Sequence, residues 1–137
     1  MKIWHSPTPS TIFTRMHSTS PPSITPMFLL TYKYDAKDET ELANRRSVIR
    51  PLHLVHAQKA KESGKLYLGG ASLPISSENS NDGITGVLIF RNSTLQDVEN
   101  FAKTDPYVTK KATHGIPLVK SYTIRSWNVV IKPDTLV

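Results

Sequence analysis

The stretch 50-RPLHLVHAQKAKESGKLYLGG-70 changes from a helical pattern to a strand pattern along its length. Its first part has the apolar and alanine spacing of a helix and ends at Ser63. The next residue, Gly64, suits the left-handed backbone conformation just past a helix end. The second part, 65-KLYLGGAS-72, carries β-favouring side chains and predicts a strand. We therefore expect a helix that leads directly into a strand, with Gly64 at the junction.

The predicted helix begins well upstream of this stretch. Asp38 or Thr40 can cap its start, and two glutamates in its first turn suit the positive end of the helix dipole. Pro51 lacks the backbone N–H that a helix interior requires. Two alternatives follow: one helix bends at Pro51, or a short helix ends near Ile49 and a second begins at Pro51.

The segments on either side supply three more strands and one more helix. The run 27-MFLLTYKY-34 predicts a strand, and the uninterrupted apolar run in 83-GITGVLIFRN-92 predicts a strand in the centre of a sheet. The helix 93-STLQDVENFAKT-104, a connecting segment over 105–119 and the alternating strand 120-KSYTIRSWNVVIK-132 follow. The order β-α-β-β-α-β predicts an α+β, ferredoxin-like domain, with an antiparallel sheet and both helices on one face.

The side-chain pattern also predicts which faces of the last helix and strand are buried. In the helix, Ser93 and Gln96 should form a capping box, and the buried face should comprise Leu95, Val98, Phe101 and Ala102. In the strand, one side carries Tyr122, Ile124, Ser126, Asn128 and Val130, and the other carries Thr123, Arg125, Trp127, Val129 and Ile131. Neither side is cleanly polar, so the sheet face that no helix covers is expected to meet a partner sheet.

The composition excludes several classes of protein. The chain has 137 residues, which suggests one domain, and it has no cysteine, which excludes disulfides and thiolate metal sites. Its net charge is +6, but the basic residues are spread out and no aromatic residues alternate with them, so no nucleic-acid partner is predicted. No apolar run approaches the roughly 20 residues of a membrane span. For this reason no membrane partner is expected. The sequence also has no glycine-rich phosphate or dinucleotide motif, so no cofactor is expected.

The first 26 residues differ in composition from the rest. They contain five of the ten prolines and no acidic residue, since the first acidic residue is Asp35. Such a segment cannot bury much apolar surface. It is either a mitochondrial presequence, which is basic and rich in hydroxyl side chains, or a disordered extension of a cytoplasmic protein. A further alternative is upstream sequence that is not normally translated, with Met16 or Met27 as the start. We expect an extension over residues 1–26, the domain over 27–132 and a short tail over 133–137.

His53 is the side chain of the opening stretch that most needs an explanation. At 100° per residue it falls near the middle of an apolar helix face of roughly 60°. The other members of this face are Leu42, Ile49, His56 and Ala60, with Arg46 beside them. A lone histidine in such a place is usually a core residue with a hydrogen-bond partner. His53 and His56 have the spacing of a metal pair, but no further ligands occur at a telling spacing, so no metal site is predicted.

Asp105 follows the second helix in the sequence 104-TDPYV-108. An Asp-Pro pair commonly starts a turn, and a turn alone would explain it. An aspartate here can also lie at the edge of the sheet, where its carboxylate could accept a hydrogen bond from His53. Such a bond fixes the tautomer of an imidazole and prepares its other nitrogen to act as a general base.

Several of these motifs together resemble the YCII-related domain family. They are Arg-Pro-x-His-Leu at 50–54, Gly-Lys-Leu-x-x-Gly-Gly at 64–70 and Asp-Pro-Tyr at 105–107, and the resemblance covers residues 27 to about 131. It implies a dimeric α+β barrel, in which two ferredoxin-like units pack sheet to sheet. It also implies a His-Asp pair, which matches His53 and Asp105. Family members often continue Asp-Pro-Tyr with a small residue and Gly-Leu or Gly-Val. This chain has the longer 108-VTKKATHGIPLV-119, so the rim of its pocket is expected to differ.

The resemblance implies an enzyme, since a related member of the family removes chloride from a hydroxylated aromatic ring. We expect proton abstraction or elimination on a small anionic or phenolic compound, with His53 as the base and Asp105 as the residue that orients it. The expected substrate-binding residues are Arg46, Arg50, Tyr107 and Gly70, with one of the two arginines as the anion anchor.

The resemblance also implies a homodimer that forms through the open sheet face. Two alternatives to an enzyme remain. The first is a non-catalytic binding or interaction domain that keeps the His-Asp pair for structure. The second is a haem- or metal-binding barrel, since other families of this fold bind haem.

Overall fold

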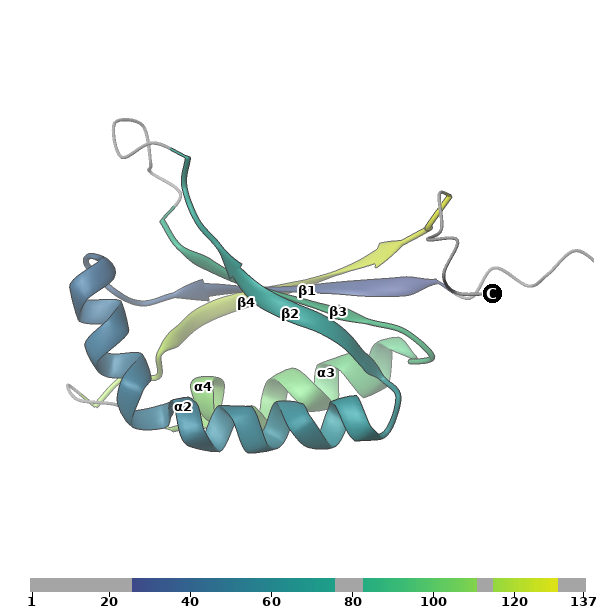
Figure 1. Ribbon diagram of the computed structural model, residues 1–137, viewed down its shortest axis with the longest axis horizontal. Coiled ribbons are helices and arrows are strands. Elements are labelled where there is room, and N and C mark those ends of the chain that lie inside the picture. The colour runs from purple at the N-terminus through teal and green to yellow at the C-terminus, as the bar shows by residue number, and fades with distance from the viewer. Residues whose placement is uncertain (1–25, 76–82, 111–114, 131–137) are drawn as a thin grey trace, which may run out of the picture.

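The chain forms an antiparallel sheet with its helices packed against one face (Figure 1). This computed structural model describes residues 26–75, 83–110 and 115–130. The elements, in chain order, are β1 (Met27–Tyr34), α2 (Glu39–Glu62), β2 (Leu66–Ser72), β3 (Thr85–Phe90), α3 (Leu95–Thr104), α4 (Pro106–Thr109) and β4 (Val119–Trp127). The strand order is β2-β3-β1-β4. The predicted α+β arrangement is confirmed, with α4 as an addition, and β3 lies inside the sheet as its apolar run indicated.

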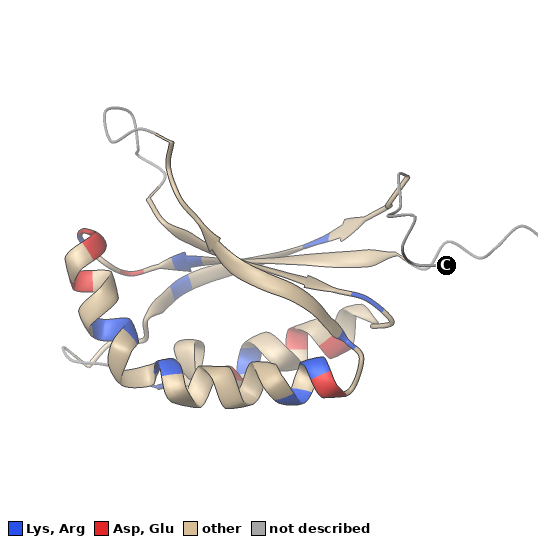
Figure 2. Cartoon of the chain, in the orientation of Figure 1, with Lys and Arg blue, Asp and Glu red and all other residues tan. Residues whose placement is uncertain are grey.

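Some predictions concern residues that the structure does not describe. The expected extension over 1–26, apart from residue 26 itself, and the expected tail over 133–137 lie outside the described residues. Within the described ranges, every helix is too short or too polar to cross a membrane. Figure 2 shows the lysines and arginines spread over helices and strands, with acidic residues between them on the helices, rather than gathered on one surface.

The helix α2 is a single bent helix rather than two helices. Asp38 caps its start, because its side chain accepts a hydrogen bond from the backbone N–H of Glu41, and the helix continues without a break through Pro51. Figure 1 shows that α2 changes direction along its length. A proline removes one helical hydrogen bond and crowds the preceding turn, so we attribute the bend to Pro51. Ser63 is the C-cap, and Gly64 follows with a φ of 80°, in the left-handed region predicted for it.

Two predictions about α3 need correction. Its capping box consists of Thr94 and Asp97, one residue later than predicted, because each side chain accepts a hydrogen bond from the other residue's backbone N–H. The Ser93 hydroxyl instead donates to the backbone carbonyl of Arg91. The first turn leaves Leu95 half exposed, so the buried face contains only Val98, Phe101 and Ala102.

The segment from Asp105 to the end of β4 also differs from the prediction. Residues 106–109 form α4, in which the Asp105 side chain caps the helix and Pro106 is the first residue. Proline is favoured at the first position of a helix, so the Asp-Pro pair is a helix start as well as a turn signal. The strand predicted over 120–132 ends at Trp127. Trp127 pairs with Met27, the first residue of β1, so residues beyond it have no position on β1 to pair with.

The core lies between the sheet and the helices. Phe28, Leu30 and Tyr32 alternate along β1 and are buried on the helix side. Leu88 and Phe90 of β3 lie directly beside Leu30 and Phe28, and the buried face of α3 packs against this group. Tyr32 has no exposed surface, so its hydroxyl needs a hydrogen-bond partner inside the protein.

Arg45 is a buried cation that the sequence pattern did not predict. Its exposed fraction is 2%. Its guanidinium donates hydrogen bonds to the backbone carbonyls of Asp35, Ile116 and Pro117, which lie just after β1 and just before β4. Arg45 therefore fastens the first half of α2 to the sheet end where these two segments meet.

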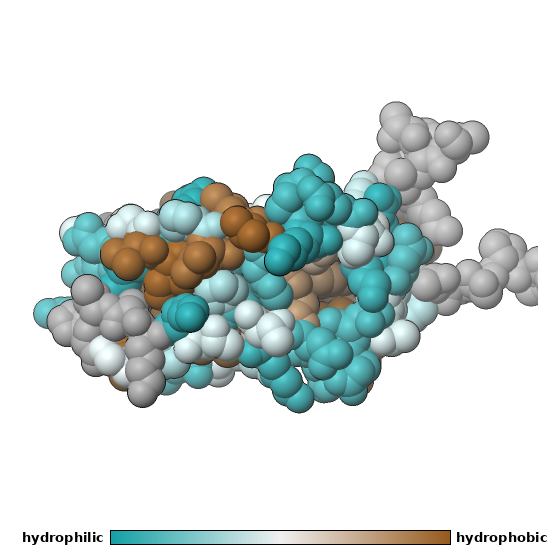
Figure 3. Space-filling view, turned by 90° about the horizontal axis from the view of Figure 1, so that it is seen from below, coloured by the Kyte–Doolittle hydropathy of each residue, from teal (hydrophilic) through white to brown (hydrophobic). Residues whose placement is uncertain are grey.

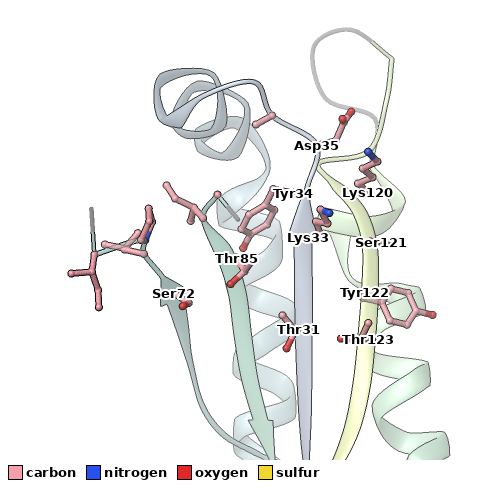
Figure 4. Close-up of a pocket in the computed structure, with 16 residues that line it drawn as sticks. Thr31, Lys33, Tyr34, Asp35, Ser72, Thr85, Lys120, Ser121, Tyr122 and Thr123 are labelled. Atoms are coloured by element: carbon pink, nitrogen blue, oxygen red, sulfur yellow. The ribbon is translucent and has the colours of Figure 1, made fainter. Parts of the chain in front are cut away.

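The opposite face of the sheet is not covered by any helix of the described residues (Figure 1). Its apolar side chains gather at one end, where the neighbours across the strands are Leu68, Ile89 and Leu29, followed by Met27 and Trp127. At the other end the neighbours are Ser72, Thr85, Lys33 and Ser121, which line a hollow of about 890 Å³ (Figure 4). One half of the face therefore suits an apolar partner surface, and the other half is hydrophilic.

Candidate active site

A cleft of about 280 Å³ lies between α2, α4 and the helix-facing side of the sheet. Five of the six site residues predicted from the sequence line it directly, and these are Arg46, Arg50, His53, Gly70 and Tyr107. The sixth, Asp105, is fully buried behind the cleft wall and contacts His53. The structure therefore brings residues from three separate sequence motifs into one site.

His53 and Asp105 are in direct contact. The Nδ1 atom of His53 lies 2.8 Å from Oδ1 and 3.0 Å from Oδ2 of Asp105. His53 retains 14% exposure at the cleft, whereas Asp105 has none. An ionised carboxylate only accepts hydrogen bonds, so Nδ1 carries the proton, and in the neutral ring Nε2 is left as an acceptor on the opposite side.

Two more donors complete the surroundings of the Asp105 carboxylate. The Tyr32 hydroxyl donates to Oδ2 at 2.7 Å, and the backbone N–H of Tyr107 donates to Oδ1 at 3.0 Å. Burial raises the pKa of the Tyr32 hydroxyl well above its usual range, and the nearby Asp105 charge raises it further. Tyr32 therefore stays protonated and donates. With three donors, the carboxylate can remain buried and ionised.

The ring of Tyr107 fixes the plane of the His53 ring. The two rings are stacked with centroids 3.8 Å apart and planes 6° apart. Tyr34 in turn meets Tyr107 edge to face, with centroids 6.3 Å apart. Burial raises the pKa of Tyr107 to about 12, so its hydroxyl is neutral at physiological pH. The histidine is thus held by a carboxylate at its edge and by an aromatic ring on its face.

Arg46 and Arg50 give the cleft a positive side. They lie one helical turn apart on α2, and both line the cleft. Arg46 is partly buried, whereas Arg50 is exposed. The charge of each arginine opposes the burial-driven rise in the pKa of Tyr34 and Tyr107, which places both cations near these rings. A neutral base beside two cations suits a small anionic compound.

Strands β2 and β3 contribute three glycines to the sheet side of the cleft, and one of them leaves room for a tyrosine side chain. A Cβ atom on Gly86 would lie 2.5 Å from the Tyr34 hydroxyl oxygen, and one on Gly69 would lie 3.3 Å from Cγ of Leu88. A Cβ atom on Gly70 would meet nothing within 4 Å. Gly70 borders the cleft with open space beside it, whereas a side chain at Gly86 would require Tyr34 to move.

The sequence reasoning missed Tyr32 and Tyr34, both of which line the cleft from β1. A usable signal was present, because alternation along β1 places Phe28, Leu30, Tyr32 and Tyr34 on the same side of the strand. A tyrosine on the core side of a strand needs a partner for its hydroxyl, and Asp105 is that partner for Tyr32.

His56 lies outside the cleft and has a packing role. Its Nε2 atom lies 3.0 Å from the backbone carbonyl oxygen of Phe101, and its ring packs against the Phe101 ring with centroids 4.4 Å apart. His56 therefore joins α2 to α3. Among the described residues, no group of three or more histidine, aspartate or glutamate side chains could hold a metal ion.

Comparison with known proteins identifies the family. The sequence profile of the YCII-related domain matches residues 27–128. The chain belongs to the YCII-related domain family. No curated protein sequence matches this member. A solved structure of similar fold is 5-chloro-2-hydroxyhydroquinone dehydrochlorinase (TftG) from Burkholderia phenoliruptrix AC1100, in complex with 2,5-dihydroxybenzoquinone. The TM-score is 0.52 at 22% identity, over 74% of this chain and 92% of that chain, and at this identity the likeness shows the fold.

Proposed function

We propose that this YCII-related protein is an enzyme of the lyase or isomerase type, which takes a proton from a small anionic or phenolic compound. The observation that carries the proposal is the 2.8 Å contact between His53 Nδ1 and Asp105, at the wall of a cleft that Arg46 and Arg50 also line. A histidine oriented by a buried carboxylate has the arrangement of a general base. The name and ligand of the structural neighbour TftG support a hydroxylated ring as the substrate class, by analogy of fold alone.

Each residue has a defined part in the proposed reaction. The Nε2 atom of His53 takes the substrate proton, and the Asp105 carboxylate stabilises the resulting imidazolium. In an elimination, the electron pair of the broken bond to hydrogen forms the new double bond, and the leaving group departs with its own bonding pair. In an isomerisation, the proton returns to another atom. Arg46 and Arg50 hold the anionic group of the substrate, and Tyr107 keeps the imidazole in place.

The proposal includes a homodimer, formed by the apolar half of the open sheet face defined by Met27, Leu29, Leu68, Ile89 and Trp127. An uncovered apolar surface of this kind commonly marks an interface. A mitochondrial location, which rests on the composition of residues 1–26, stays a prediction.

The test of the proposed function is turnover by the full chain. Chloride release from 5-chloro-2-hydroxyhydroquinone would be measured first, and proton exchange in deuterated water would be followed by NMR for a panel of unchlorinated hydroxylated rings. We expect His53→Gln to reduce the rate by about a hundredfold or more, the usual contribution of a general base.

His56→Gln is the matched control, because His56 lies on the same helix, is also partly buried, and does not line the cleft. It should leave the rate within a few fold of the wild-type rate. A His53→Gln variant that keeps wild-type rates, or a wild-type chain that catalyses neither reaction, would refute the proposal.

One observation favours a second candidate, a non-catalytic binding domain. Asp105 also caps α4 and accepts a hydrogen bond from the Tyr32 hydroxyl, so the pair would persist for structural reasons alone. In that case hydroxylated rings would bind without any proton exchange, and His53→Gln would change stability but no rate.

A further inference from the structure

The position of the Tyr34 side chain depends on the absence of a side chain at Gly86. Its ring extends from the end of β1 toward β3 (Figure 4). Its hydroxyl oxygen lies where it would be only 2.5 Å from a Cβ atom on Gly86, a distance that real Cβ atoms do not tolerate. The φ angle of Gly86 is not positive, so its backbone conformation does not require glycine. A glycine inside an inner strand is destabilising relative to alanine. Its presence here is explained by the space that the Tyr34 hydroxyl needs.

The Tyr34 hydroxyl has a proton to donate and no acceptor within the described part of the protein. Tyr32, two residues earlier, donates to Asp105, but no side chain or carbonyl among the described residues accepts a hydrogen bond from Tyr34. Burial raises the pKa of the Tyr34 hydroxyl, which keeps it protonated, although the positive charge of Arg46 opposes the rise. The hydroxyl and the guanidinium therefore form a pair of donors at the cleft without a protein anion between them.

The position of Tyr34 relative to His53 gives the cleft two functional ends. Tyr107 separates the two residues, since it stacks on the His53 ring and meets the Tyr34 ring edge to face. The acceptor atom of His53 and the donor hydroxyl of Tyr34 both belong to side chains that line the same cleft. In a conjugated ring, loss of a proton at one position spreads negative charge to an oxygen at another. A base at one end and a donor pair at the other match this distribution of charge.

We propose that the Tyr34 hydroxyl, together with Arg46, binds the anionic oxygen of a planar hydroxylated ring whose proton is taken by His53. The proton moves from the substrate to Nε2 of His53, the bonding pair stays with the conjugated ring, and the oxygen that gains charge accepts the hydrogen bond from Tyr34. Gly86 is a positioning residue, because its missing side chain leaves the place for this hydroxyl. The chemistry rests on the proposed function, whereas the recognition of the anionic oxygen can be tested by binding alone.

The probe is 4-nitrophenol, whose ionised form is distinguished from the neutral form by its visible absorbance, with nitrobenzene as the uncharged analogue. We expect the wild-type protein to bind the phenolate in preference to the neutral phenol. Tyr34→Phe should weaken phenolate binding by about tenfold or more, the usual effect of losing a hydrogen bond to a charged group, and should leave nitrobenzene binding unchanged. Tyr67→Phe is the control, because Tyr67 lies outside the cleft with its ring beneath Arg91.

A second variant tests the position of the hydroxyl without removing it. Gly86→Ala should displace the Tyr34 hydroxyl and weaken phenolate binding as much as Tyr34→Phe does, and the double variant should be little worse than either single variant. Equal phenolate affinity in the wild type and Tyr34→Phe, or no preference of the wild type for the phenolate, would overturn the inference. If either of these binding results came together with loss of turnover in His53→Gln, the proposed function would stand and only the inference about Tyr34 would fail. If phenolate binding depended on Tyr34 but no turnover occurred, the proposed function alone would fail.

Discussion

At the residue scale, the carboxylate of Asp105 has both a structural role and a proposed chemical role. It accepts hydrogen bonds from His53, Tyr32 and the backbone of Tyr107, and it has no exposed surface. Asp105→Asn keeps the shape but replaces one acceptor oxygen with an amide group that cannot accept. We expect the free energy of unfolding to fall by about 1–3 kcal/mol, because one buried donor loses its acceptor. Activity should also fall, because the amide no longer holds the His53 tautomer.

Denaturant unfolding measures the first effect, and Asp97→Asn is its matched control. Asp97 also caps a helix, but its carboxylate is solvent-accessible, so its replacement should cost less stability than that of Asp105. An Asp105→Asn variant as stable as the wild type would contradict the structural part of this account.

The tyrosines of the cleft predict a loss of stability at high pH. The unfolded chain loses a tyrosine proton at a pH of about 10, whereas the pKa of Tyr107 in the folded protein is raised to about 12. Between these values the unfolded chain binds fewer protons, so the free energy of unfolding falls as the pH rises. Tyr107→Phe keeps the stacked ring and removes this titration. Its unfolding free energy should match the wild type at pH 7 and decline less steeply above pH 10. Identical slopes for the two proteins would refute the assignment.

Much of the candidate site was predictable because its residues stand in short motifs. The motifs gave Arg50, His53, Asp105 and Tyr107, and the helical period of α2 added Arg46. Alternation along β1 could have placed Tyr34 on the cleft side of the sheet. Its proposed role could not be predicted, because that role depends on the absence of a side chain at Gly86, on a different strand. Tyr34 and Gly86 are 52 positions apart, and a contact over such a separation leaves no local sequence pattern unless both residues belong to recognisable motifs.

At the element scale, Arg45 determines how the first half of α2 is attached. Its guanidinium binds three backbone carbonyls in segments that border β1 and β4. Arg45→Met keeps most of the volume but leaves these partly buried acceptors without the Arg45 donors. At about 1 kcal/mol for each lost hydrogen bond, the free energy of unfolding should fall by about 3 kcal/mol. Thermal or denaturant unfolding would measure it.

Arg91→Met is the comparison for that experiment. Arg91 is an exposed arginine that lies over the Tyr67 ring at 4.6 Å, a contact worth about 0.5–1 kcal/mol at such sites. If both replacements cost the same, Arg45 would not be the attachment that its contacts suggest.

The elements themselves were largely predictable, and the errors have local causes. Strand β1 has the predicted bounds, and α2 ends one residue before the predicted Ser63, because alternation and Gly64 mark these positions clearly. The cap of α3 was misplaced by one residue because Ser93, Thr94, Gln96 and Asp97 offer two overlapping capping patterns. The helix α4 was missed because Asp-Pro begins both turns and helices. The helical turn is defined by backbone hydrogen bonds from the N–H of Thr109 to the carbonyl of Asp105 and from the N–H of Lys110 to the carbonyl of Pro106, which no local motif predicts.

At the scale of the whole molecule, the sequence pattern predicted the antiparallel sheet and the inner position of β3, but not the division of the open sheet face. The β-α-β-β-α-β order predicted the sheet and its uncovered side. Apolar and polar halves of that side become visible only once the register aligns Leu29 with Ile89 and Lys33 with Thr85 across β1 and β3. A shift of one residue would have turned every one of these side chains to the other face.

This division makes the predicted homodimer specific to one half of the face. The apolar half should be buried between two copies, so light scattering after size exclusion should give about twice the chain mass of 15.3 kDa, less any part removed from the extension. Ile89→Asp would place a charge in that contact and should yield a folded monomer, because an unpaired buried carboxylate is costly. Thr85→Asp introduces the same charge on the same strand and face, but at the polar end, and should remain dimeric. A wild-type monomer at micromolar concentration, or an Ile89→Asp variant that still dimerises, would show that the copies do not meet through this surface.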